Sequence, residues 1–348
     1  MGEAYTFLLR AHCATYNHSP YITDALNGFV MQKTDFPFVC TIMDDASTDG
    51  EQEVIKKYMQ DFFDLQDASV AYERDTDYGH VIFAQHKTNK NCFFAVILLQ
   101  ENHYSQKKSK APYLTEWLNT KYIALCEGDD YWIDPMKLQK QVFFLETHPE
   151  YDMVCTRFNH KIYEEGKIIP SDLYDRVMSL DIKGLEIKQE HFIKFAQPHP
   201  CTVMYRSGSL DDNDIVPKLK YKFDLPMYYC FLYQHRIWLM GDKTAVHVLH
   251  KDSLTRQGRS NMWNMYLGYA DILKYVPNDK ILMQICAIRY RNDYLLPNSL
   301  QEKYGFKTYL NNLREYIFYK PSFRNVVSAT IKILKNRIRF KRTISGHI

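Results

Sequence analysis

Two short apolar stretches in the first 130 residues each run directly into a group of carboxylates. Phe36–Met43 is followed by Asp44 and Asp45, and Tyr122–Cys126 is followed by Glu127–Asp130, which holds three acidic side chains and one glycine. Apolar stretches of this length and ending are typical of buried β-strands. In a parallel sheet the carboxyl ends of the strands meet at one edge, and ligands bind beyond that edge. The pattern therefore predicts a sheet with an acidic ligand site at one edge.

Helical patterns alternate with these strands. An additional strand is expected over Phe7–Cys13, and a polar turn at Ser47–Gly50 is expected to cap the helix that follows it. Apolar residues at helical spacing predict helices over Tyr21–Met31, about Glu51–Phe63 and a segment that begins at Pro135. The type of two more apolar stretches, Val81–Ala84 and Ala95–Leu99, is left open. The order predicts an α/β fold with a mainly parallel central sheet flanked by helices.

The second half of the chain has a different character. From about Tyr151 to Leu249 short apolar stretches alternate with polar loops, and from about Asn261 the sequence has a helical pattern to its end. No stretch rich in Pro, Gly or Ser separates these parts. We therefore expect a fused helical C-terminal extension.

Composition excludes several classes of protein. The 44 Lys and Arg against 41 Asp and Glu give a net charge of +3, which is too small to indicate nucleic-acid binding. The longest strictly apolar run, Cys92–Leu99, is far shorter than the roughly 20 residues of a membrane-spanning helix, and Tyr5–Leu9 is too short for a signal-peptide core. We expect a cytoplasmic chain whose eight cysteines, none in a CxxC pair, are reduced and mostly buried.

The carboxylates of Glu127, Asp129 and Asp130 indicate a specific chemistry. Three neighbouring carboxylates repel one another unless water, a basic side chain or a cation neutralises them, and Mg²⁺ and Mn²⁺ prefer such oxygen ligands and bridge them to phosphates. Gly128 allows a tight turn and a close approach to a ligand. The alternative is a solvated acidic turn. For Asp45, near Asp44 and Asp49, the alternatives are a hydrogen bond to a nucleoside and a helix-capping turn.

These motifs, in this order and spacing, resemble those of family-2 glycosyltransferases of the bacterial surface-polysaccharide type. The matching segments are Ala14–Asn17, Met43–Gly50, Glu101–Gln106 and Tyr122–Leu138. The resemblance is specific over about residues 5–150 and weaker to about 258. It implies the A-type, Rossmann-like nucleotide-sugar-binding fold, with a catalytic domain over 1–258 and a helical extension over 259–348. Within the domain, 1–150 would bind the nucleotide sugar and 151–258 the acceptor.

The resemblance also implies residue roles. The donor-binding set would be Thr15, Tyr16, Asn17, Asp45, Asn102, Gln106, Glu127 and Asp129. A Mn²⁺ or Mg²⁺ ion would be held by Asp129, Asp130 and His250, and His250 matches the family's position better than His247 does. That ion would stabilise the charge on the departing nucleoside diphosphate.

An inverting transferase also needs a general base on the acceptor side. Asp224 best matches the family's position, and the alternatives are that it caps a helix or that the base is Asp211, Asp212 or Asp214. His199 and Arg206 lie where the family builds its acceptor side, unless this segment is a structural strand with a surface arginine.

The last residues form a basic pattern. On a helix, Ile331, Leu334 and Ile338 would share one face, with basic residues around the rest as far as Arg342. Such a helix can lie on an anionic membrane surface, and the alternative is a solvated helix packed on the domain. We expect peripheral contact with the inner face of the cell membrane.

The sequence therefore predicts a metal-dependent, inverting glycosyltransferase that moves a sugar from a nucleoside-diphosphate donor to a saccharide or lipid-linked acceptor. Two alternatives stay open. A sugar-nucleotide nucleotidyltransferase is disfavoured because residues 12–19 contain no glycine for a phosphate loop. A catalytically silent carbohydrate-binding or nucleotide-sugar-binding protein is disfavoured by the intact Asp45, Asp129, Asp130 and Asp224.

Overall fold

The computed structural model describes residues 7–171, 174, 183–194, 196–251, 259–290, 313–314, 316–319, 321 and 323–331. The chain forms two compact units. The first comprises Met1–Ile187, Gln197–Asp212 and Gln234–His250, and the second comprises Lys188–Ala196, Asn213–Tyr233 and Lys251–Ile348. Apart from Ile331, the expected basic amphipathic helix lies outside the described residues.

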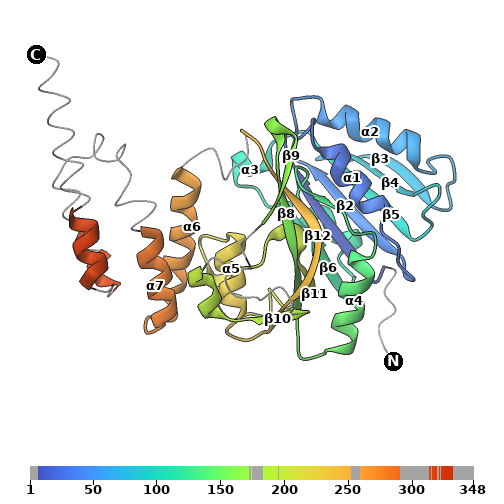
Figure 1. The fold of residues 1–348 in the computed structure, drawn as a ribbon. Coiled ribbons are helices and arrows are strands. Elements are labelled where there is room, and N and C mark those ends of the chain that lie inside the picture. The colour runs from blue at the N-terminus through green and yellow to red at the C-terminus, as the bar shows by residue number, and fades with distance from the viewer. Residues whose placement is uncertain are drawn as a thin grey trace, which may run out of the picture. The chain divides into compact units, whose positions relative to one another are not determined.

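The first unit is built on a twelve-stranded mixed sheet (Figure 1). Its centre consists of four parallel strands in the order β6 (Tyr122–Leu125), β1 (Leu9–Thr15), β2 (Phe38–Asp44) and β5 (Cys92–Leu99). Because Thr15 of β1 pairs with Asp44 of β2, the carboxyl ends of these strands are aligned. The expected α/β fold with a parallel sheet centre is confirmed.

The remaining strands flank this centre. They are β3 (Ala71–Asp75), β4 (Gly79–Gln85), β7 (Tyr131–Trp132), β8 (Met153–Ile162), β9 (Lys167–Pro170), β10 (Gly184–Ile187), β11 (Met204–Arg206) and β12 (Ile237–Leu249). Of their pairings only β8 with β12 is parallel, and the others are antiparallel. The two stretches whose type was left open belong to β4 and β5. At 10 and 13 residues, β8 and β12 are longer than the short strands expected in the middle of the chain.

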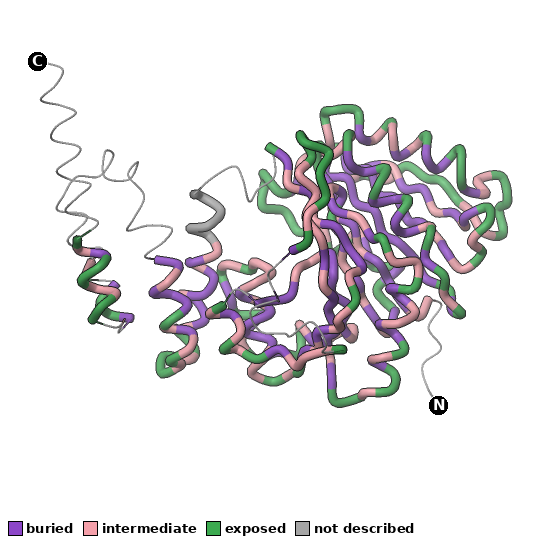
Figure 2. Tube along the Cα trace, in the orientation of Figure 1, coloured by how far each residue is buried: buried purple, intermediate pink, exposed green. Residues whose placement is uncertain are grey.

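Helices cover both faces of the parallel centre. Successive side chains of a strand point to opposite faces, and β5 shows this directly. Phe94 contacts Phe29 of α1 (Ile22–Val30) and Tyr58 of α2 (Glu51–Phe62). Ala95 packs with Trp117 of η1 (Ala111–Trp117) in a second apolar cluster. Figure 2 shows the central strands buried and the outward side of α2 exposed.

The short strand β7, which follows the second acidic group, lies against β12, outside the parallel centre of the sheet. β7 pairs antiparallel with β12, so that Tyr131 lies beside Val246. A Cβ atom on Gly28 of α1 would lie 2.8 Å from the backbone nitrogen of Trp132, so α1 packs directly on β7. α4 (Lys137–Thr147) follows and packs against β8. The end of β12 is thereby held next to the acidic loop.

The smaller helical elements of the first unit are α3 (His103–Gln106), η2 (Tyr163–Glu165) and η4 (Pro200–Thr202). Those of the second unit are η3 (Gln189–Lys194), η5 (Val216–Lys218), α5 (Asp224–Phe231), α6 (Arg259–Ile272) and α7 (Lys280–Arg289). The expected C-terminal helices are thus present. In this unit Asp271 of α6 accepts a hydrogen bond from the Lys220 backbone N–H at 2.6 Å, and Asp279, the N-cap of α7, accepts one from the Tyr229 hydroxyl at 2.8 Å.

Two other expectations can be compared with the structure. All eight cysteines are buried and free, as expected. Within the described part of the chain, none of the helices combines the length and the apolar character that crossing a bilayer requires.

Candidate active site

The acidic loop after β6 continues alongside the end of β1. The Gly128 N–H donates to the Ala14 carbonyl at 3.2 Å. Hydrogen bonding between this segment and β1 therefore continues beyond the last residue of β6. A Cβ atom on Gly128 would lie 2.0 Å from the Thr15 hydroxyl oxygen. Only glycine permits this approach, and it sets the position of Asp129 at the carboxyl edge of the sheet.

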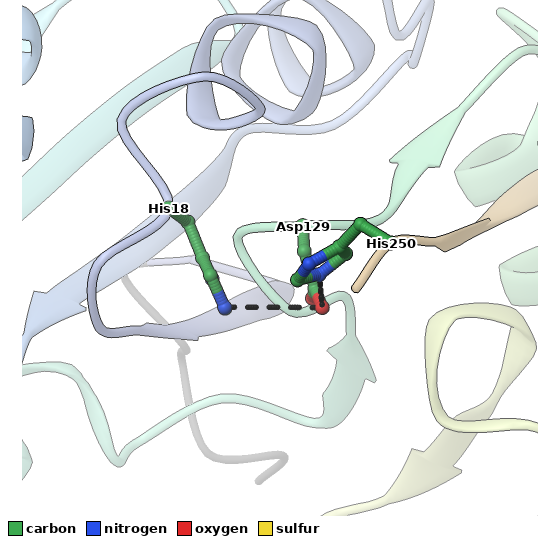
Figure 3. A group of neighbouring side chains, drawn as sticks. All are labelled: His18, Asp129 and His250. Carbon is green, nitrogen blue, oxygen red and sulfur yellow. Dashed lines mark hydrogen bonds and ion pairs between the residues drawn. The ribbon is translucent and has the colours of Figure 1, made fainter. Parts of the chain in front are cut away.

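Three side chains converge at this edge (Figure 3). The Asp129 Oδ2 atom lies 3.2 Å from His250 Nε2 and 3.8 Å from His18 Nε2. One possible ligand atom from each residue lies within 4.8 Å of the others. His18 comes from the loop after β1, and His250 directly follows β12. The structure therefore brings together Asp129 and His250, which the resemblance paired, and adds His18, which sequence reasoning missed.

The electrostatics of the three residues suit ligation. Burial opposes the charge of Asp129, but the hydrogen bond from His250 and the nearby His18 lower the pKa of its carboxyl. Burial lowers the pKa of His18. At neutral pH the site therefore holds an ionised carboxylate and a neutral His18 imidazole, the forms that bind metals.

Aromatic packing orients the histidine from β12. The Tyr21 ring stacks on the His250 ring, with centroids 4.4 Å apart and planes 30° apart. The edge of the same tyrosine meets Tyr163 at 4.6 Å. His250 is 1% exposed, so its ring has little freedom to turn away from Asp129.

A buried carboxylate that sequence reasoning also missed lies beneath the first loop. Glu51, the first residue of α2, accepts hydrogen bonds from the Thr15 hydroxyl, the His18 N–H at 2.8 Å and the Ser47 hydroxyl at 2.9 Å. Burial raises the pKa of Glu51 to about 7. The signal that could have indicated it is an acidic first helical residue directly after a strand-end loop.

The expected donor residue Asn17 joins two loops. Its side-chain carbonyl accepts from the Thr48 N–H at 2.8 Å, and its own N–H donates to the Ser47 hydroxyl at 2.8 Å. Its φ of 56° lies in the left-handed region, which asparagine tolerates. The neighbouring Tyr16 is 43% exposed at the same edge. Asp49 accepts from the Glu51 N–H at 3.1 Å, but the N-cap of α2 is Gly50, so the polar turn precedes the helix as expected without a capping side chain.

Asp45 is the residue for which nucleoside contact was expected. Its Oδ1 accepts from the His103 N–H at 2.9 Å, and its Oδ2 accepts from the Tyr104 N–H at 3.0 Å and from the Lys110 ammonium at 3.1 Å. With 2% of its surface exposed, Asp45 holds the start of α3 against the sheet. The Asn102 side chain caps the same short helix by accepting from the Ser105 N–H at 2.7 Å.

Asp130 does not join Asp129 and His250, so its expected place among the same metal ligands needs correction. Its carboxyl is buried, and its Oδ1 accepts from the Val248 N–H at 2.9 Å. Burial and then the charge of Asp129 raise the pKa of Asp130 well above its usual range. Adjacent residues in the sequence thus have carboxyls in different surroundings.

Arg206 also lies apart from this edge. In the sheet it pairs with Tyr122 at the start of β6, whereas Asp129 comes after the end of that strand. The guanidinium donates to the carbonyls of Tyr151 at 3.1 Å and Leu145 at 2.6 Å. These contacts support the alternative of a structural role in the strand, because this group binds the protein's own backbone.

The other expected residues are placed as follows. Glu127 is exposed in the acidic loop, and Gln106 is exposed at the end of α3. His199 precedes η4, with its Nδ1 atom 3.2 Å from the Cys201 sulfur. Burial lowers the pKa of His199 well below its ordinary value.

Asp224 belongs to the second unit. It is the first residue of α5, and Phe223 is the N-cap, so the capping alternative is wrong. Burial raises the pKa of the half-buried Asp224. The alternative bases Asp211, Asp212 and Asp214 are all exposed.

No family model matches the chain. It is similar to the uncharacterised protein Rv1520 of Mycobacterium tuberculosis, with 36% identity over 152 residues, or 44% of this chain and 35% of that relative. The chain thus matches about a third of the length of this curated relative.

Two solved structures are similar over most of the chain. One is S. aureus TarS 1-349 in complex with UDP-GlcNAc, with a TM-score of 0.56 and 18% identity over 94% of this chain and 88% of that one. The other is the mannosyltransferase PcManGT from Pyrobaculum calidifontis in complex with GDP-Man and Mn²⁺. It has a TM-score of 0.50 and 15% identity, over 95% of this chain and 88% of that one. The chain has the A-type glycosyltransferase fold that the sequence predicted.

Gly128→Ala tests the close approach of the two loops. The new methyl group meets the Thr15 side chain, so we expect a loss of about 1–3 kcal/mol in the free energy of unfolding. Denaturant unfolding measures it, and Glu127→Ala, an exposed change in the same loop, is the control. Equal stability of the two variants would contradict the tight contact.

Glu51→Gln tests the buried carboxylate. Its pKa rises from 4.5 to about 7 on folding, so the folded wild type holds its proton more tightly, and stability falls as pH increases from about 4.5 to about 7. The glutamine does not titrate. The free energy of unfolding of the variant, relative to that of wild type, therefore increases from pH 4.5 to about 7 and is constant above that pH. Urea unfolding between pH 4.5 and 8 measures this difference. Glu53→Gln, an exposed change on the same helix, should show the same dependence of stability on pH as wild type. If Glu51→Gln also shows the wild-type dependence, the raised pKa of Glu51 is refuted.

Proposed function

We propose that this chain is an inverting glycosyltransferase that moves a sugar from a nucleoside-diphosphate donor to a saccharide or lipid-linked acceptor in bacterial glycan synthesis. The observation that carries the proposal is the convergence of Asp129, His250 and His18 at the carboxyl edge of the parallel strands. In open α/β sheets this edge is where nucleotides bind. Support also comes from the similar solved structures, one bound to UDP-GlcNAc and one to GDP-Man and Mn²⁺.

The three converging side chains fit a divalent cation. They offer one carboxylate oxygen and two imidazole nitrogens within 4.8 Å of one another. Mg²⁺ prefers an octahedral shell of oxygen atoms, so two imidazole nitrogens make it the poorer fit. We propose Mn²⁺ as the working ion because the similar mannosyltransferase is bound to Mn²⁺. A bound cation would neutralise charge that develops on the departing diphosphate.

The chain's own residues prepare this site before the donor arrives. The nearby His250 and His18 favour the ionised form of the Asp129 carboxyl, and Tyr21 holds the His250 ring in place. Glu51 fixes the loop that carries His18 through its bonds to Thr15 and to the His18 backbone. The ligands are therefore preorganised, which reduces the cost of assembling the site.

We propose that the nucleoside lies against the loop after β1. The exposed Tyr16 ring offers a flat surface for a base to stack on. Asp45 acts mainly by holding α3, because three donors already occupy its two oxygen atoms. Asn102 and Gln106 belong to this positioned segment, and Glu127 is exposed beside the metal site.

We propose Asp224 as the general base that accepts the proton of the acceptor hydroxyl. A base works best when its pKa lies near the working pH, and burial moves the pKa of Asp224 upward from that of an ordinary aspartate. The exposed Asp211, Asp212 and Asp214 lack this burial.

Asp129→Asn tests the metal site. The change keeps the volume but removes the charge that faces the cation, so we expect sugar transfer to fall about 10²-fold or more and the Mn²⁺ requirement to rise. Initial rates with a panel of nucleotide sugars at increasing Mn²⁺ measure both effects. Asp61→Asn, an exposed change on α2, is the control. Full turnover of the wild type in excess chelator would remove the proposed metal dependence.

Asp224→Asn tests the base. The loss of a general base typically costs about 10²–10⁴ in rate. We expect the variant to bind nucleoside diphosphate and Mn²⁺ normally, by calorimetry, yet to transfer at least a hundredfold more slowly. Asp211→Asn is the matched comparison. If that variant loses activity while Asp224→Asn keeps it, the base is in the exposed loop.

A further inference from the structure

A second group of potential metal ligands lies in the first unit and consists of one buried carboxyl and two partly buried histidines. Asp130, His199 and His247 each offer one ligand atom, and these atoms lie within 4.8 Å of one another. They come from the loop after β6, the segment before η4 and strand β12. The group shares no residue with the Asp129 site.

The polar atoms in this group are poorly satisfied by the protein. Asp130 is 1% exposed, and its Oδ2 is reached by no nitrogen or oxygen donor among the residues that the structure describes. The Val248 N–H occupies the other oxygen, Oδ1, and the Cys201 thiol, a weak donor, also faces this carboxyl. The His247 Nδ1 atom is likewise buried without a hydrogen bond from the described residues. A buried polar group without a partner is unfavourable, so such a group points to a ligand that is missing.

The imidazoles are close enough to share one ligand. The rings of His199 and His247 have centroids 4.3 Å apart and planes inclined by 44°. The His199 Nδ1 atom lies 3.2 Å from the Cys201 sulfur. His247 also pairs in the sheet with His160 of β8, which places a third imidazole beside the group. Imidazoles grouped around one carboxyl are a ligand set that Zn²⁺ binds.

The backbone around the group is held firmly. The Trp132 indole N–H donates to the Cys201 carbonyl at 2.8 Å, and the Gln141 amide donates to the Thr202 carbonyl at 2.9 Å. These bonds fix the segment that carries His199. His247 is fixed by the pairing of β12 with β8. Ligands on fixed backbone form a site without rearrangement of the fold.

We propose that Asp130, His199 and His247 bind a second divalent cation, Zn²⁺, whose role is structural. It ties the acidic loop to β12 and to the segment before η4, beneath the donor site. The proposal does not rest on the proposed transferase activity, because a structural cation is bound with or without a donor. The competing explanation is a neutral, buried Asp130 packed among histidines with no metal.

The experiment measures how many Zn²⁺ ions the full chain binds. Bound metal is first stripped with a chelator, the chelator is removed, and Zn²⁺ is then added. Equilibrium dialysis followed by elemental analysis gives the stoichiometry. The double variant Asp129→Asn/His250→Gln disables the edge site and isolates the inner one. We expect this variant to bind one Zn²⁺ and its melting temperature to rise with Zn²⁺.

The addition of His247→Gln to the double variant should weaken Zn²⁺ binding about a hundredfold or more. His148→Gln, a histidine change near the end of α4, is the matched control and should keep the ion. Circular dichroism verifies folding, and His199→Gln replaces His247→Gln if the latter does not fold. If the double variant binds no Zn²⁺, or if these inner changes leave its affinity intact, the inner site does not exist. Neither result depends on transferase activity, so it leaves the proposed function to its own tests.

Discussion

The close approach of Gly128 to Thr15 is the constraint on which the rest of the site depends. The acidic loop continues along β1 because position 128 has no Cβ atom to meet the Thr15 side chain. This approach sets Asp129 within reach of His18, three residues after Thr15. The same Thr15 hydroxyl donates to Glu51, so the two loops and the first turn of α2 form one connected arrangement. Backbone packing therefore positions Asp129 and His18 beside each other.

Asp129 and Asp130 show how surroundings, rather than residue type, decide the chemistry of a carboxylate. Asp129 receives a hydrogen bond from a histidine at the sheet edge, and its pKa is lowered despite burial. Asp130 is enclosed by the protein, and burial together with the neighbouring charge raises its pKa. An ionised group thus faces the edge, while its neighbour accepts a hydrogen bond from the Val248 backbone and lies near His199 and His247. Neighbouring carboxyls of one short loop therefore belong to two separate groups of side chains.

The histidines of both groups depend on one long-range pairing. His250 lies 121 residues after Asp129, and the pairing of β7 with β12, together with the hydrogen bond from the Val248 N–H to Asp130, brings the end of β12 to the acidic loop. Because β12 also pairs with β8, His247 is held in the sheet beside the same loop. The strand and the residue that follows it therefore supply one histidine to each group, three residues apart.

The sequence by itself determined three of the four central strands, β1, β2 and β6, and the edge of the sheet that carries the acidic groups. Short apolar stretches alternate with helical patterns, and two of these stretches end in carboxylates, which is local information. Only the tertiary structure decided what each polar group contacts. Asp45 holds α3 in place, and Arg206 binds backbone carbonyls away from the acidic loop. His18 and Glu51 belong to the site although neither is part of a motif that the sequence analysis identified. The physical reason is that the partner of a polar side chain depends on which distant segments pair beside it, and no local pattern encodes that pairing.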